Sequence, residues 1–171
     1  DPRYLRDPVA VAEAVRAFVA VNVIDRELVF GGHPAISPFV WDAANSLGAA
    51  DRIIIYQSRF FERSIPPEAG YFTRLVWTPE VAGDLQASLG VMREWMLIQR
   101  RLADGTQLPP FAGGVFIGGE DGVETEWNIF TTNYPGTPAF PVASTLGASA
   151  HILSDPNKSI HVPAQVRAVL A

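Results

Sequence analysis

The 171-residue sequence has no cysteine, few charged residues and no long apolar run. Without cysteine there is no disulfide, no thiol nucleophile and no thiolate ligand for a metal. Charged residues make up 18% of the chain, which is low and is typical of an α/β core with covered faces. No apolar run approaches the roughly 18 residues that a membrane-spanning helix requires, and no signal peptide is visible. We therefore expect a cytoplasmic protein without a membrane partner.

Basic residues are scarce as well. The formal net charge is −5 and the isoelectric point is near 5.1. Such a chain has no broad basic surface for a nucleic-acid backbone, so we expect no nucleic-acid partner, although a local basic pocket for a small phosphate ligand fits this charge. The hydrophobic content of 48% is enough to bury a full core. Because the chain starts with Asp rather than Met, we expect residues 1–171 to be one domain cut from a longer protein.

The most informative stretch is AGGVFIGGEDGVETEWNIF, residues 112–130. It opens with an apolar run, residues 115–117, that suits a buried parallel strand. Two glycines, two acids and a third glycine follow, and then a helical pattern places Val123, Trp127 and Phe130 on one face. A strand, a glycine turn and a helix together present backbone N–H groups to an anionic ligand. Glycine is needed there where φ is positive or where a ligand approaches too closely for a Cβ. The stretch is neither a Walker loop nor a GxGxxG motif.

A second unit of the same kind lies upstream. The apolar residues 28–30 predict a strand, Gly31 and Gly32 predict the turn, and Pro34 is a plausible start of the next helix. His33 follows the glycines directly, where its ring could reach a ligand phosphate or ribose; the alternative is a histidine that hydrogen-bonds the loop backbone. Two such units in one small domain predict two turns that face one crevice.

Polar residues also follow a third predicted strand, residues 52–57. Tyr56, Gln57 and Ser58 lie at its carboxyl end, where ligands bind in open α/β sheets. They are either contacts to a base or ribose, or residues that simply leave the core. The Pro-rich segment 59–72 carries aromatic residues and is interpreted as a ligand lid or an oligomer contact.

The second half of the sheet and its helices complete the prediction. Residues 74–78 predict a strand, and Thr78-Pro79-Glu80 predicts the start of a helix that runs to about residue 103. A last short strand is expected at residues 139–142. Ser144 and Thr145 then open another helix and form a third place for close backbone approach. His151 and His161 have no partners at metal-ligand spacing, so both are interpreted as structural.

At these residues the chain resembles the SLOG group of Rossmann-like domains. The resemblance rests on LVFGGHPAISP, IYQSRFF and FIGGEDGVETEW and covers most of residues 7–153. That group includes the Lonely Guy (LOG) cytokinin-activating enzymes, the DNA-processing Smf/DprA proteins, and sensor domains attached to TIR and other effectors in bacterial antiphage systems. The chain is most similar to the sensor-type domains.

LOG enzymes carry PGGxGTxxE. Aligned on Gly122, this chain has Glu126 at the position of the family's glutamate, but Ile117 replaces the proline, Val123 replaces the threonine, and the turn is one residue longer. The resemblance implies that Arg93, on the preceding helix, contacts phosphate and that Glu126 contacts ribose hydroxyls. The acids at positions 120, 121 and 124 are interpreted instead as favourable partners of the helix dipole, although the first two also border the predicted pocket.

The resemblance implies a Rossmann-like α/β fold: an open, mostly parallel sheet of about five strands with helices on both faces. It also implies a regulatory sensor for an ADP-ribose-type nucleotide, such as a cyclic ADP-ribose isomer, that forms a homo-oligomer with a fused or associated effector such as TIR. The alternatives are a LOG-like nucleoside monophosphate phosphoribohydrolase and a purely structural oligomerisation module. We predict no catalytic residue, metal or cofactor. The predicted ligand-binding residues are Gly31, Gly32, His33, Pro34, Tyr56, Gln57, Ser58, Arg93, Gly118, Gly119, Glu120, Asp121, Gly122, Val123, Glu126, Ser144 and Thr145.

Overall fold

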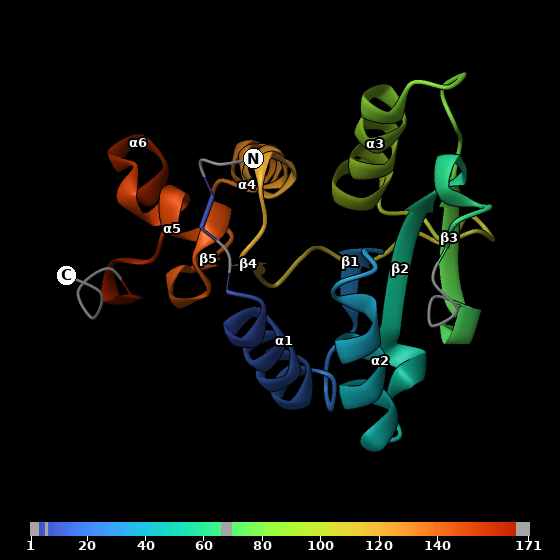
Figure 1. Cartoon of the computed structure of the whole chain (residues 1–171), viewed down its shortest axis with the longest axis horizontal. Coiled ribbons are helices and arrows are strands. Elements are labelled where there is room, and N and C mark those ends of the chain that lie inside the picture. Colours follow the sequence, from blue (N-terminus) through green and yellow to red (C-terminus); the bar gives the residue numbers. More distant parts are fainter. Residues whose placement is uncertain (1–3, 6, 66–69, 167–171) are drawn as a thin grey trace. The chain divides into compact units, whose positions relative to one another are not determined.

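Strands and helices alternate along the chain, which confirms the predicted α/β class (Figure 1). The computed structural model describes residues 4, 5, 7–65 and 70–166. The strands are β1 (Leu28–Gly31), β2 (Ile53–Ser58), β3 (Arg74–Thr78), β4 (Gly114–Ile117) and β5 (Ala139–Val142). The helices are α1 (Pro8–Asn22), α2 (Ser37–Ser46), α3 (Leu85–Glu94), α4 (Asp121–Asn133), α5 (Gly147–Ser154) and α6 (Pro156–Ser159). Short turns are η1 (Ala50–Arg52), η2 (Arg59–Phe61), the π-helical η4 (Trp95–Gln99) and η5 (Ala143–Thr145).

All named strand pairs in the described residues are parallel, as predicted. They form a three-stranded sheet in the order β1-β2-β3 and a two-stranded sheet of β4 and β5. In the larger sheet Gly31 is in register with Tyr56, and Gln57 is in register with Trp77. The carboxyl ends of β1 and β2 therefore lie at the same edge, where the sequence places Gly31, Gly32 and the polar residues 56–58.

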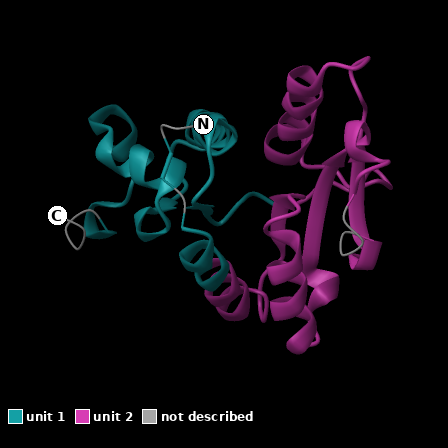
Figure 2. Ribbon diagram, in the orientation of Figure 1, with its two compact units in different colours: residues 1–14, 109–171 teal, residues 15–108 magenta. Residues whose placement is uncertain are grey.

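The chain divides into two compact units (Figure 2). Unit 1 contains residues 1–14 and 109–171, and unit 2 contains residues 15–108. The boundary passes through α1 and through the loop that precedes β4. Each unit contains one of the two Gly-Gly pairs at which the sequence predicts a turn. That residues 1–171 act as one domain stays a prediction.

Each unit has its own apolar core. In unit 2 the whole of β2 is buried, and Ile53, Ile54 and Ile55 are completely covered. In unit 1 the core is aromatic: the Phe116 and Trp127 rings are 4.9 Å apart between centroids, and Phe130 packs 5.8 Å from Phe116. Trp127 and Phe130 are buried, which confirms the face of α4 predicted from the sequence. Among the helices of the described part, none combines the length and the hydropathy of a membrane span.

Three helix starts differ from the prediction. Ser144 and Thr145 lie in η5, so α5 begins at Gly147. Residues 34–36 form a turn in which the backbone N–H groups of Ile36 and Ser37 both donate to His33 O, so α2 begins at Ser37 and not at Pro34. The start predicted near Thr78 is also wrong, because α3 begins at Leu85. There Asp84 accepts a hydrogen bond from Ala87 N at 3.0 Å and caps the helix. The predicted helix to residue 103 ends instead in the π-helical turn η4 at residue 99.

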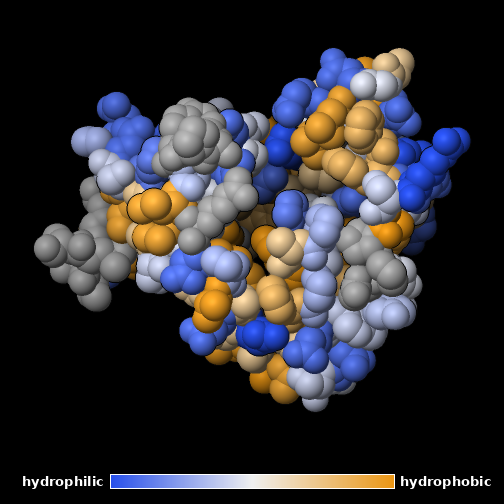
Figure 3. All heavy atoms as spheres, viewed as in Figure 1, coloured by the Kyte–Doolittle hydropathy of each residue, from blue (hydrophilic) through white to orange (hydrophobic). Residues whose placement is uncertain are grey.

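Apolar side chains also reach the surface of unit 2. Figure 3 shows them over α3, and the exposed large residues of this segment and its flanks are Val81, Leu85 and Ile98. Tyr71 is exposed too and packs on Trp41, with ring centroids 5.3 Å apart. Tyr71 belongs to the segment 59–72 that was predicted to be a lid or an oligomer contact. Residues 66–69 of that segment lie outside the described residues, and both interpretations stay predictions.

Candidate functional site

The Gly-Gly turn of unit 1 has the backbone conformation that the sequence predicts. Gly118 and Gly119 follow β4 with φ angles of +55° and +81°, a region that residues with a Cβ rarely adopt. A Cβ on Gly119 would also overlap the Cγ2 of Val123, in the first turn of α4. The helix begins at Asp121, so Gly122 is the second residue of α4 and not part of the turn. The predicted strand–turn–helix unit is therefore present in unit 1.

The backbone of this turn is packed against the start of α5. Gly118 N donates to Thr145 Oγ1 at 2.7 Å. The N–H groups of Ala148 and Ser149 donate to Gly119 O and Gly118 O, at 2.9 and 3.2 Å. The close backbone approach predicted after β5 does occur, but its partner is the protein's own glycine turn. The buried Thr145 thus lies beside the turn, whereas Ser144 is exposed.

A residue with a strained backbone lies directly before α5, next to this glycine turn. Leu146 has φ +59° and ψ −155°, which is a region populated almost entirely by glycine. The next residue, Gly147, has φ +63°, and a Cβ there would lie 2.5 Å from Gly119 O. A strain of about 1–3 kcal/mol at Leu146 persists only because the surrounding hydrogen bonds fix the backbone.

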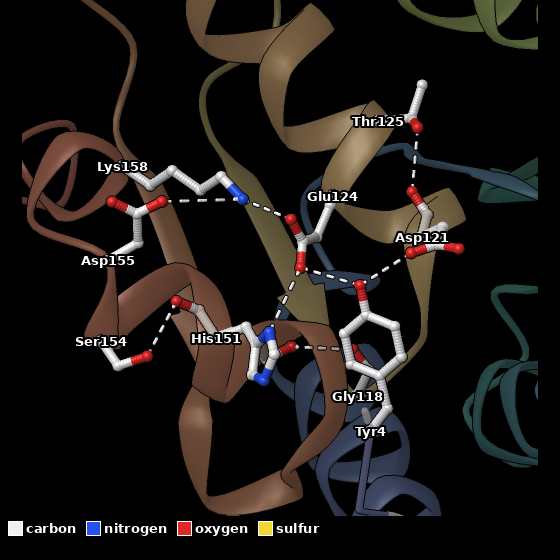
Figure 4. Close-up of polar contacts among 10 residues, drawn as sticks. Tyr4, Gly118, Asp121, Glu124, Thr125, His151, Ser154, Asp155 and Lys158 are labelled. Carbon is white, nitrogen blue, oxygen red and sulfur yellow. Dashed lines mark hydrogen bonds and ion pairs between the residues drawn. The ribbon is translucent and has the colours of Figure 1, made fainter. Parts of the chain in front are cut away.

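The acids in the first turn of α4 have partners within unit 1 (Figure 4). We call these residues the Glu124 cluster: Tyr4, Asp121, Glu124, His151 and Lys158. The Tyr4 hydroxyl lies 2.9 Å from both Asp121 Oδ1 and Glu124 Oε1 and can donate to either. Lys158 Nζ donates to Glu124 Oε2, and His151 Nδ1 lies 3.6 Å from Glu124 Oε1. These contacts join the N-terminal segment, α4, α5 and α6.

The Glu124 cluster keeps its central carboxylate ionised. Partial burial alone would raise the pKa of Glu124, but the hydrogen bonds from Lys158 and Tyr4, with the charge of Lys158, hold that pKa below its usual range. Burial and the two carboxylates raise the pKa of Tyr4, so its hydroxyl keeps the proton that it donates. Glu124 and Asp121 do sit in the first turn of α4, as the dipole interpretation requires. Specific side chains neutralise them in addition.

The prediction of a turn at Gly31-Gly32 in unit 2 is wrong, because Gly31 is the last residue of β1, Gly32 N donates to Tyr56 O, and the turn comes at residues 34–36. Neither Gly31 nor Gly32 has a positive φ. A Cβ on Gly31 would lie 3.1 Å from Met92 Cε, and a Cβ on Gly32 would lie 2.9 Å from Gln57 Oε1. Glycine is needed at these positions for the space that neighbouring side chains occupy.

The polar residues at the end of β2 divide into two kinds. The hydroxyl of the buried Tyr56 donates to Arg101 O at 2.9 Å, and burial raises the pKa of Tyr56 to about 12. Ser58 Oγ accepts from Phe60 N at 3.2 Å and caps η2. Gln57 is only 4% exposed, and its Oε1 is buried without a hydrogen-bond partner among the described residues. Gln57 is thus the one member of this trio whose side-chain acceptor is left unsatisfied.

The remaining predicted residues of unit 2 are more exposed. His33 Nδ1 accepts from Ala35 N at 3.2 Å, which is the loop-backbone role weighed in the sequence. Desolvation of the ring lowers the pKa of His33 below 6.5, so the neutral ring carries its proton on Nε2. Pro34 is an exposed turn residue, and Arg93 lies half-buried on α3. The phosphate contact of Arg93 stays a prediction.

The structure therefore places the predicted residues in two groups, one in each unit. Unit 1 brings together Gly118, Gly119, Thr145 and the start of α4. Glu120 directly precedes this helix, Glu126 lies in its second turn, and both are half-buried. Unit 2 brings together Gly31, Gly32, His33 and the end of β2. That both groups ring one pocket stays a prediction. Within the described part, no three His, Asp or Glu side chains are grouped so that they could hold a metal ion.

Sequence reasoning missed three members of the Glu124 cluster. Tyr4 precedes Asp121 by 117 positions, and Lys158 follows Glu124 by 34. His151 was interpreted as structural without a partner. No local spacing connects these residues, because the contacts depend on how α5, α6 and the N-terminal segment pack on α4.

Comparison with known proteins gives one match. The model of the SLOG cluster3 family matches residues 3–166, a range that includes all of unit 2, most of unit 1 and every predicted site residue. No curated protein and no solved structure matches the chain. The α/β order, the parallel strands and the strand–glycine–helix units agree with the fold of that group. The chain is a Rossmann-like, nucleotide-related SLOG domain and belongs to the SLOG cluster3 family.

Proposed function

We propose that this SLOG domain is a regulatory sensor for a nucleotide-derived signal of the ADP-ribose type. The observation that carries the proposal is the β4–Gly118-Gly119–α4 unit, in which both glycines have positive φ and a helix follows at once. Backbone N–H groups at such a helix start favour an anionic ligand. In this proposal the signal is linear or cyclic ADP-ribose.

The acidic first turn of α4 shapes the choice of ligand. Carboxylates repel phosphate, but here Tyr4 and Lys158 hold Glu124, and Tyr4 also reaches Asp121. This internal neutralisation lowers the repulsion that an anionic ligand meets. The half-buried Glu126, two residues further along α4, is then the acceptor for ribose hydroxyls.

Binding acts on an effector only if the ligand has different affinities for two states of the protein. We propose that those states differ in how the domain assembles with further copies of itself and with a fused or associated effector, such as a TIR domain in antiphage defence. The exposed apolar residues on and beside α3 are candidates for the contact between copies.

The alternative is a LOG-like phosphoribohydrolase. A hydrolase of this kind uses a carboxylate to stabilise positive charge on the ribose or to move a proton. Two of the first-turn carboxylates are already engaged by Tyr4 and Lys158, which favours a structural role for them. Glu120 and Glu126 are the other two carboxylates that the sequence offers as candidates, and product analysis separates the two functions.

The test is isothermal titration of the purified domain with ADP-ribose, cyclic ADP-ribose isomers, NAD and AMP, followed by product analysis of each mixture. We expect saturable binding of linear or cyclic ADP-ribose and recovery of the ligand intact. Glu126→Gln should weaken that binding by about 3- to 10-fold, because the hydrogen bond to a charged oxygen becomes a weaker one to a neutral amide oxygen. The exposed Glu13→Gln on α1 is the matched control and should bind as the wild type does. Release of free base from AMP would establish the phosphoribohydrolase activity instead. If none of the four ligands bound, the proposed sensor function would be contradicted.

A further inference from the structure

Gln57 is a polar residue in the most buried strand of the protein. Every residue of β2 is buried, and Ile53, Ile55 and Gln57 share one face of it because side chains alternate along a strand. Gln57 Oε1 has no hydrogen-bond partner in the described part of the chain. An unpaired buried acceptor destabilises a fold, so such an atom calls for a functional explanation.

The backbone beside this amide is built to admit it. Gly32 has an ordinary φ, so its lack of a side chain is not needed for its conformation. A Cβ at Gly32 would lie 2.9 Å from Gln57 Oε1 and 3.3 Å from Ile55 Cγ2. The Gly32 N–H is already donated to Tyr56 O at 3.0 Å, so it does not satisfy the amide oxygen. The glycine makes room for the amide without pairing with it.

The groups around this edge are suited to an uncharged ligand. His33 is neutral, because desolvation lowers its pKa and because Nδ1 accepts from Ala35 N. An amide and a neutral imidazole match a heterocyclic base better than a phosphate.

We propose that Gln57 is the base-recognition residue of this domain and that its Oε1 accepts a hydrogen bond from the exocyclic amino group of an aminopurine such as adenine. A glutamine amide offers an acceptor and a donor side by side, which matches the amino group and the adjacent ring nitrogen of adenine. This inference rests on the proposed function, since the base is part of the proposed nucleotide signal.

The test compares two probes that differ in one group. They are ADP-ribose and its analogue in which purine, without the 6-amino group, replaces adenine. Wild type should bind ADP-ribose about 3- to 10-fold more tightly than the analogue, which corresponds to one net hydrogen bond. Gln57→Met keeps the side-chain size but has no amide, and it should bind both probes equally.

The outcomes separate the two proposals. If wild type binds ADP-ribose and Gln57→Met keeps the same preference, the role of Gln57 is wrong and the sensor function stands. If wild type shows no preference, the role is also wrong. If wild type binds neither probe, the proposed function itself fails.

A measurement of thermal stability shows whether Gln57→Met is folded, and a second variant tests where the amide lies. Gln57→Met removes an unpaired acceptor, so its thermal midpoint should equal or exceed that of wild type. Gly32→Ala should push the amide away and lower the preference for ADP-ribose by at least half. Its control is Gly90→Ala on α3, where an added Cβ meets no atom within 4 Å and the preference should not change. A full preference in Gly32→Ala would contradict the placement of the amide.

Discussion

The two Gly-Gly pairs of this chain both lie at the carboxyl end of a strand, yet glycine serves a different need in each. In unit 1, Gly118 and Gly119 have φ angles of +55° and +81°, so the backbone conformation itself requires glycine. In unit 2, Gly31 and Gly32 have ordinary φ angles and make room for Met92 and Gln57. The same pair of residues is therefore required for the backbone conformation in unit 1 and for the absence of a Cβ in unit 2.

The difference extends to the polar groups around each glycine pair. In unit 1 the carbonyls of Gly118 and Gly119 accept from the start of α5, and the acids of α4 are held by Tyr4 and Lys158. In unit 2 the glycine pair borders a buried amide oxygen without a partner. In unit 1 these polar groups thus have partners within the protein, whereas unit 2 has an unsatisfied acceptor that a ligand can use.

The strongest test of this comparison is to add one methyl group to each glycine pair. Gly119→Ala should lower the free energy of unfolding by about 2–4 kcal/mol, because alanine is disfavoured at positive φ and its Cβ would overlap Val123. Gly31→Ala should change it by less than about 1 kcal/mol, because only the flexible Met92 methyl must move. Urea unfolding of both variants measures the difference.

A double variant identifies the origin of the larger effect. Val123→Ala in the Gly119→Ala background removes the overlap but leaves the positive φ. We expect part of the loss, about 1–2 kcal/mol, to remain after the effect of Val123→Ala alone is subtracted. Equal effects of Gly119→Ala and Gly31→Ala would show that the two glycine pairs do not differ in the way described.

The second test concerns the charges that hold the turn of unit 1. Lys158→Met leaves Glu124 without its cation, and should lower the free energy of unfolding at pH 7 by about 1–2 kcal/mol, between the values for exposed and buried pairs. The folded-state pKa of Glu124 lies below its ordinary value of 4.5, so the stabilisation is present above that pH and is lost as the pH falls through the folded pKa. The difference between variant and wild type should therefore shrink in acid.

Unit 2 offers the matched control for this ion pair. Arg59 and Glu62 form an exposed pair with about half of each side chain accessible. Arg59→Met should change the stability by less than about 0.5 kcal/mol at any of these pH values. If the two Met variants behaved alike, the Glu124 cluster would be no more than a surface ion pair.

Local patterns in the sequence predicted the features that depend on local physics. The strand at residues 115–117, the buried face of Trp127 and Phe130, and the glycine conformation at Gly118 and Gly119 all follow from periodicity and from the need for positive φ. The start of α3 was wrong because Thr78 resembles a cap, whereas Asp84 forms the cap after a turn at Gly83.

The candidate site was less predictable because its contacts are between distant elements. Gln57 stood out only as one of three polar residues, and nothing local separated it from Tyr56 and Ser58. Their hydrogen bonds to Arg101 O and from Phe60 N depend on the packed structure. The need for glycine at position 32 could not be predicted either, because it depends on Gln57, which lies on the neighbouring strand.

The smallest effect should come from His33, the titrating group of the turn in unit 2. Its folded-state pKa lies below 6.5, so the unfolded chain binds more protons in this range and stability falls as the pH drops from above 6.5 through the folded pKa. Since the ring is exposed, we expect this loss to stay below about 0.5 kcal/mol. His33→Gln should remove this pH-dependent loss. Between pH 7.5 and pH 5 the free energy of unfolding of the variant, measured with urea, should therefore rise relative to that of wild type. His161→Gln is the control for losing an exposed histidine in unit 1. Parallel curves for wild type and His33→Gln would mean that the surroundings of His33 in unit 2 do not desolvate the ring, and any acid sensitivity between pH 7.5 and pH 5 would then come from other groups.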